Sequence, residues 1–220
     1  MVTHRWLALT EIRLRRREVQ ERMKKTLLLF LLLPFLAGAS HAQESRQDIS
    51  VSVGGTFQPF IVGNDVQQSS TNGLGGLASY RYMLTPRSGL EINYLYAQNT
   101  QKYYTSFNNV RVHDRMQEFS GAYVLNANFK NWNPFIEGGP AAFMFTPLDD
   151  AGTNQLDVKG QTILGGVYGG GVAYELSPSF DIRAEYRGQL MKTPDFGLAP
   201  QKTGRFYNVS NPVIGFAYHF

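Results

Sequence analysis

The sequence predicts an all-β protein whose fold is an eight-stranded antiparallel up-and-down transmembrane β-barrel. Three observations predict it: an alternating C-terminal segment, an apolar leader near the N-terminus, and connections that are alternately short and long. The chain has 220 residues, of which 13% are aromatic, and no Cys. The lack of Cys excludes thiolate metal sites and Cys nucleophiles, and it fits an exported protein without disulfides.

The leader begins at Met23, which is followed by two lysines, a short apolar run and small residues up to Ala42. This order is typical of a secretory signal peptide. Pro34 interrupts the run, which is shorter than the ~20 residues of a membrane-spanning helix. We therefore expect a signal peptide over residues 23–42, cleaved after Ala42, and one barrel domain over residues 43–220.

Residues 1–22 precede this complete signal and are rich in arginine, which is also typical of a nucleic-acid-binding arm. We interpret them instead as an upstream extension from a misplaced start. The first 42 residues hold eight of the 21 basic and three of the 17 acidic residues. The remaining 13 basic and 14 acidic residues give a net charge near −1. The basic character thus belongs to the leader, and we expect no nucleic-acid partner.

The rest of the chain divides into eight segments in which large apolar residues recur at every second position, the period of a strand with one apolar face. In order, we expect strands over residues 48–60, 75–84, 89–98, 115–129, 135–145, 162–176, 180–190 and 207–220. The seventh is the clearest, because Phe180, Ile182, Ala184 and Tyr186 alternate with Asp181, Arg183, Glu185 and Arg187.

The connections between these segments alternate in length. Residues 85–88, 130–134 and 177–178 are tight turns, whereas residues 61–74, 99–114, 146–161 and 191–206 are predicted to be long polar loops. Small outer-membrane barrels have an even number of strands, short periplasmic turns and longer external loops.

The last strand carries four large apolar residues on one face: Ile214, Phe216, Tyr218 and Phe220. This ending resembles the C-terminal sorting signature of bacterial outer-membrane β-barrel proteins, so we expect these four residues to form a sorting strand. In water such a terminal strand would leave an open apolar edge, whereas a closed barrel would place this face against lipid. A soluble secreted β-sandwich also gives alternating strands, with the apolar face as its core. The terminal strand, the leader and the rhythm of the connections together favour the barrel.

Aromatic residues fall near the ends of the predicted strands, where they would form girdles at the two membrane interfaces. These residues are Tyr80, Tyr82, Tyr94, Tyr96, Trp132, Phe135, Phe145, Tyr174, Tyr186 and Tyr218.

The opposite face of the strands carries charges, which would point into the barrel: Arg81, Glu91, Glu118, Glu137, Arg183, Glu185 and Arg187. An eight-stranded barrel is just wide enough for side chains to fill it, and buried charges need partners. We therefore expect these residues to form a plug of ion pairs. A gated narrow pore and an acid–base pair of carboxylates are the alternatives.

No other motif predicts a catalytic, cofactor-binding or metal-binding residue. Gly165–Gly171 is rich in glycine but lacks the ending of a phosphate loop, and we interpret it as a strand that makes room for bulky interior neighbours. Asp149, Asp150 and Asp157 lack the spacing of an EF-hand.

Four segments resemble the OmpA-type eight-stranded barrel and its small relatives such as OmpX: Leu90–Tyr94, Phe135–Gly139, Asp181–Arg187 and the terminal Gly215–Phe220. The resemblance covers most of residues 47–220 and implies eight antiparallel strands with both termini in the periplasm. Unlike OmpA, the chain has no peptidoglycan-binding domain after the last strand, so we expect no cell-wall tethering.

These observations predict a small, monomeric, non-enzymatic barrel in the bacterial outer membrane, with a structural or surface-interaction role. Its expected partners are outer-membrane lipid or lipopolysaccharide and, during insertion, the barrel-assembly machinery; the aromatic and amide residues around Tyr103 and Tyr104 are candidate contacts. Two alternatives stay open: a narrow porin-like channel, and a lipid A-modifying barrel enzyme. The enzyme would need a Ser/His/acid arrangement, and no compact His-x-Ser followed by an acid is present.

Overall fold

The structure, a computed structural model, describes residues 46–106, 109–148 and 159–220. The predicted upstream extension, signal peptide and cleavage after Ala42 lie outside the described residues, as do the three aspartates of the third predicted loop. Within the described part, the only helix is the short 3-10 helix η2 (Ala199–Gln201), and no helix is long and apolar enough to cross a membrane.

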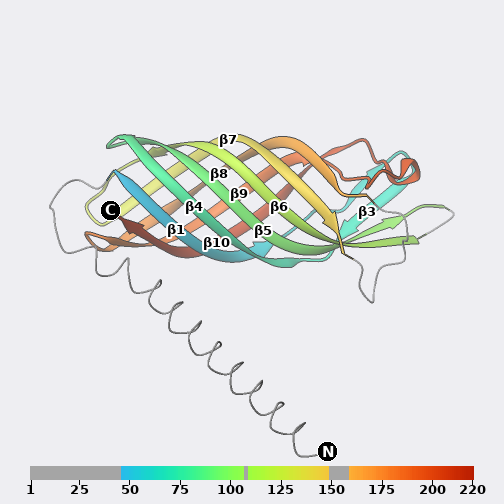
Figure 1. Ribbon diagram of the computed structural model, residues 1–220, viewed down its shortest axis with the longest axis horizontal. Helices are drawn as coiled ribbons and strands as arrows, with labels where there is room; N and C mark the ends of the chain where they lie inside the picture. The colour runs from blue at the N-terminus through green and yellow to red at the C-terminus, as the bar shows by residue number, and fades with distance from the viewer. Residues whose placement is uncertain (1–45, 107–108, 149–158) are drawn as a thin grey trace, which may run out of the picture. The chain divides into compact units, whose positions relative to one another are not determined.

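Eight of the ten strands in the described residues form a closed antiparallel barrel (Figure 1). They are β1 (Gln47–Thr56), β4 (Gly73–Thr85), β5 (Ser88–Tyr104), β6 (Asn109–Asn126), β7 (Trp132–Pro147), β8 (Gln161–Ser177), β9 (Phe180–Lys192) and β10 (Phe206–His219). Each pairs with its neighbours in chain order, and β1 pairs with β10 from Asp48↔His219 to Gly54↔Val213, which closes the sheet. The predicted fold class is confirmed.

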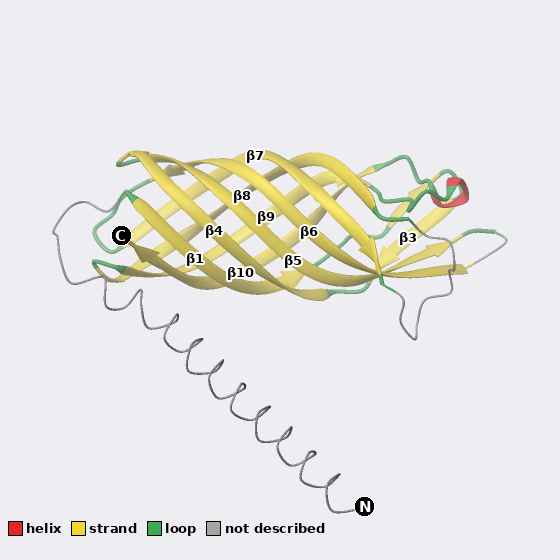
Figure 2. Ribbon diagram, in the orientation of Figure 1, coloured by secondary structure: helices red, strands yellow, loops and turns green. Residues whose placement is uncertain are grey.

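The two remaining strands, β2 (Ile61–Gly63) and β3 (Val66–Ser70), form a hairpin within the connection between β1 and β4 (Figure 2). Asn64 and Asp65 form its turn with φ angles of 49° and 59°, the left-handed conformation that two-residue hairpins require. β3 then pairs with the far end of β5. The long polar loop predicted over residues 61–74 is thus a long connection between two barrel strands, and it contains a β-hairpin that the sequence did not predict.

The connection predicted over residues 99–114 is also mostly strand. β5 and β6 continue beyond the barrel wall as a hairpin, paired as far as Tyr104↔Asn109. Alternation persists here, because Tyr103, Val110 and Val112 are buried while their neighbours face outward. The polar composition of the outward positions concealed this period.

Large apolar side chains cover the outside of the barrel. Val51, Ile92, Ile136 and Phe216 each expose more than 60% of their surface. A soluble sandwich would bury this face, whereas a membrane barrel presents it to lipid. The sandwich alternative is thereby contradicted.

Aromatic pairs mark the end of the barrel that carries the short turns, which we call the turn end; the opposite end is the loop end. Trp132 lies 4.8 Å from Tyr174 and Phe180 lies 5.0 Å from Tyr218, measured between ring centroids. Two residues assigned to the girdles do not belong there: Phe135 and Phe145 are buried inside the barrel. Both fall at inward positions of β7. A position near the end of a strand does not by itself show whether the side chain points to lipid or into the barrel.

Candidate functional site

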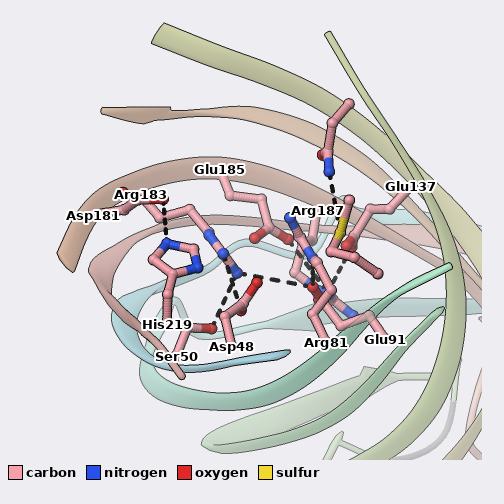
Figure 3. A network of polar contacts seen from close by, with 12 residues as sticks. Asp48, Ser50, Arg81, Glu91, Glu137, Asp181, Arg183, Glu185, Arg187 and His219 are labelled. Atoms are coloured by element: carbon pink, nitrogen blue, oxygen red, sulfur yellow. Dashed lines mark hydrogen bonds and ion pairs between the residues drawn. The ribbon is translucent and has the colours of Figure 1, made fainter. Parts of the chain in front are cut away.

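The most distinctive chemistry of the barrel lies in its interior, where all seven predicted charged residues are buried, with at most 7% of their surface exposed. They come from β4, β5, β6, β7 and β9. Figure 3 labels all of them except Glu118 and shows them close to further polar residues from β1 and β10. β8 contributes glycines at the matching inward positions.

Arg187 lies at the centre of this network and contacts three carboxylates. Its Nη1 is 2.6 Å from Glu137 Oε1 and 3.3 Å from Glu185 Oε1, and its Nη2 is 2.9 Å from Glu118 Oε1. Ser120 donates a hydrogen bond to Glu118 over 2.7 Å, and Gln189 also donates to Glu118. We call Arg187, Glu118, Glu137 and Glu185 the central cluster.

A second group lies nearer the turn end and is built around Glu91. Arg81 Nε is 2.5 Å from Glu91 Oε2, and Arg183 Nη1 is 3.8 Å from the same oxygen. Arg183 also reaches Asp48 Oδ1 over 3.1 Å. The ring of Phe135 lies under both guanidinium groups, 4.7 Å from that of Arg81 and 5.7 Å from that of Arg183. The aromatic face thus stabilises two cations that carboxylates also hold.

The sequence prediction missed several members of this network. Asp48 binds Arg183, and His219 Nε2 lies 2.8 Å from Asp181 Oδ2 (Figure 3). The signal was present, because Asp48 alternates with outward Ile49 and Asp181 alternates with Ile182. The same alternation that selected the seven residues would have selected these.

The glycines of β8 make room for the central cluster. A Cβ atom at Gly169 would lie 2.7 Å from the backbone oxygen of Tyr186 and 3.3 Å from Glu137 Oε1. At Gly171 it would lie 2.9 Å from the ring of Phe135. Small residues on this strand therefore let charged and aromatic side chains of β7 and β9 fill the space in front of it.

Toward the loop end the interior also holds a large apolar cluster, beside buried polar residues such as Gln101 and Asp114. Leu95, Met116, Phe143 and Met191 are at most 2% exposed and belong to one buried apolar cluster. Where both the inward and the outward residues are apolar, polarity does not alternate along the strand. The alternation therefore did not reveal this apolar layer.

Phe196, from the connection between β9 and β10, closes this layer from above. Its ring lies 6.4 Å from those of Tyr103 and Phe145, edge to face with each. Its backbone φ angle of 51° is rare for a bulky residue. Hydrogen bonds around Phe196 stabilise this conformation. Gln161 accepts hydrogen bonds from the backbone of Asp195 and Phe196, and Tyr103 donates one to Pro194.

This arrangement suits closure better than catalysis. Glu91, Glu118 and Glu137 each have one carboxylate oxygen paired with an arginine. The second oxygen of Glu137, Oε2, is buried and has no hydrogen-bond partner among the described residues. Among the described residues, no three His, Asp or Glu side chains converge in a way that would hold a metal ion. The charged side chains therefore form a packed network that connects strands on all sides of the barrel interior.

A closed antiparallel barrel with an apolar exterior and a packed, charged interior is a small transmembrane barrel of the bacterial outer-membrane class. The chain belongs to the outer membrane protein beta-barrel domain family, whose sequence model matches residues 28–220. No curated protein sequence matches the chain.

Solved structures show the same fold at low identity. Neisserial surface protein A (NspA) is 14% identical, with a TM-score of 0.55 over 80% of this chain and 98% of that one. OprG of Pseudomonas aeruginosa is 12% identical, with a TM-score of 0.56 over 80% of this chain and 97% of that one. At such identities the likeness shows the fold alone.

Proposed function

We propose that the protein is a non-enzymatic structural barrel of the outer membrane whose interior is permanently closed, and whose loop-end hairpins are its contact surface. The observation that supports this most directly is Arg187, fully buried and shared by carboxylates from β6, β7 and β9. The apolar layer with Phe196 above it gives a second, independent closure.

Energetics favour a plug over a pore in this geometry. A buried ion is stable only when its charge is compensated and its donors and acceptors are bonded. Moving Arg187 aside to open a passage would leave Glu118, Glu137 and Glu185 without their shared cation. The central cluster is therefore expected to keep one arrangement rather than to gate.

Planar-bilayer recording tests the closed interior. Refolded protein, whose insertion is verified by a heat-dependent change in gel mobility, should give no steady single-channel current. A well-defined current from most insertions would contradict the proposal and favour the narrow porin-like channel. Mass spectrometry of lipid A from cells with and without the protein tests the non-enzymatic part, because a lipid A-modifying enzyme would change the lipid A masses.

A further inference from the structure

The outer face of the β5–β6 hairpin carries a group of basic side chains. Lys102 of β5 and Arg111 of β6 are direct cross-strand partners, and Arg115 lies further down the same face of β6, opposite Gln98. Directly opposed side chains have Cβ atoms about 5 Å apart. We call Lys102, Arg111 and Arg115 the rim cluster.

The charges of the rim cluster are not compensated within the described part of the protein. None of the three side chains forms an ion pair with another described residue. The next cross-strand neighbours are uncharged: Ser69 of β3 lies opposite Lys102, and Thr146 of β7 lies opposite Arg115. Like charges placed directly opposite each other on a sheet are destabilising, so this arrangement favours an external anion.

The rim cluster begins where the lipid-facing surface ends. Tyr94 and Phe119 pack 4.8 Å apart on the outer face, and Gln117 donates a hydrogen bond to the Tyr94 hydroxyl over 2.7 Å. Gln98 donates likewise to the Tyr96 hydroxyl over 2.6 Å. Tyrosines with capped hydroxyls are typical of the membrane interface. Arg115 is the cross-strand partner of Gln98, one outward position beyond Tyr96 and Gln117.

We propose that Lys102, Arg111 and Arg115 bind the phosphate groups of a lipid in the outer leaflet of the membrane. The four-residue step from Arg111 to Arg115 spans about 13 Å along the strand, which suits a headgroup carrying more than one phosphate. Arginine and lysine both bind phosphate oxygens, arginine through its planar fork. The proposal rests on the proposed placement of the barrel in the outer membrane.

Native mass spectrometry of the refolded full-length barrel in a non-ionic detergent, titrated with diphosphoryl lipid A, tests this inference. The variant K102Q/R111Q/R115Q should bind roughly 100-fold more weakly than the parent, at about fivefold per basic residue near an anionic lipid surface. The parent affinity should also fall with added salt and with monophosphoryl lipid A as the probe.

The matched control is R46Q/R87Q/K130Q, which removes the same charge from exposed positions at the turn end. It should bind lipid A like the parent. Equal binding by the rim variant and the control would overturn the proposal. Inorganic phosphate that competes at the same concentration as the lipid would indicate an unspecific anion site and would also overturn the proposal. Tighter binding of a soluble sulfated polysaccharide than of lipid A would overturn it as well.

Bilayer recording separates this inference from the proposed function. A conducting parent barrel that still loses lipid A through the rim substitutions would contradict the closed interior but support the rim cluster. A parent barrel that conducts no current, and whose rim substitutions leave lipid A binding unchanged, would support the closed interior but contradict the rim cluster.

Discussion

Arg187 of β9 and Glu137 of β7 form a 2.6 Å ion pair across β8, the strand that separates them in the sheet. The pair passes in front of Gly169, whose missing side chain leaves the necessary space. Two strands that share no backbone hydrogen bonds are thus joined through the interior, which makes the pair a cross-brace of the barrel wall.

Replacing Arg187 with Met should strongly destabilise the barrel, because three buried carboxylates would lose their shared cation. Breaking a buried ion pair costs about 3–5 kcal/mol. Urea unfolding in lipid vesicles, followed by the gel mobility of unheated samples, measures the loss. Arg87→Met, in an exposed turn, is the control and should leave the urea midpoint unchanged. An unchanged midpoint for both variants would mean that the central cluster contributes nothing to stability.

Replacing Gly169 with Ala should lower stability by about 1–3 kcal/mol, the range for an overpacked core. The added methyl group would meet the Tyr186 backbone oxygen at 2.7 Å. Gly121→Ala is the matched control, because a Cβ there meets nothing within 4 Å. Equal unfolding midpoints for the two alanine variants would show that β8 can move away from the cluster.

Replacing Phe196 with Ala should open the loop end to water. The chain lacks Cys, so a single reporter Met191→Cys in the apolar layer can be labelled with a water-soluble maleimide. We expect labelling to accelerate about tenfold or more, because removing a buried aromatic side chain lowers the free energy of local opening. Leu198→Ala in the same connection should leave the labelling rate unchanged. Equal labelling rates for the Leu198→Ala and Phe196→Ala variants would contradict the inference that Phe196 closes the loop end.

Replacing Phe220 with Ala should reduce assembly into the outer membrane, if the alternating terminal strand is the sorting signal. The test is the fraction of heat-modifiable protein in the outer-membrane fraction of expressing cells. Phe206→Ala controls for lipid contact, since Phe206 is 61% exposed at the other end of β10 and Phe220 is 49% exposed. Comparable losses for both would point to lipid burial rather than sorting.

The sequence was sufficient for the barrel, for the eight strands of its wall and, apart from Phe135 and Phe145, for their two faces, because period-two alternation is a local property of each strand. It also selected the charged interior positions, Arg187 and Glu137 among them. Their pairing was beyond it, since these residues meet across an intervening strand and the contact depends on the stagger around the whole barrel. Phe196 was missed because nothing local distinguishes a loop phenylalanine that turns inward.

The hairpin β2–β3 has a consequence for how neighbouring molecules meet. Beyond the barrel it leaves β2 as the last strand of the sheet, paired only with β3. β2 offers only the three residues Ile61–Gly63, and Gly63 ends it. So short a template gives few intermolecular hydrogen bonds, and short edge strands are one means by which natural sheets resist edge-to-edge aggregation. Crowded barrels can therefore display their hairpins side by side without fusing them into a continuous sheet.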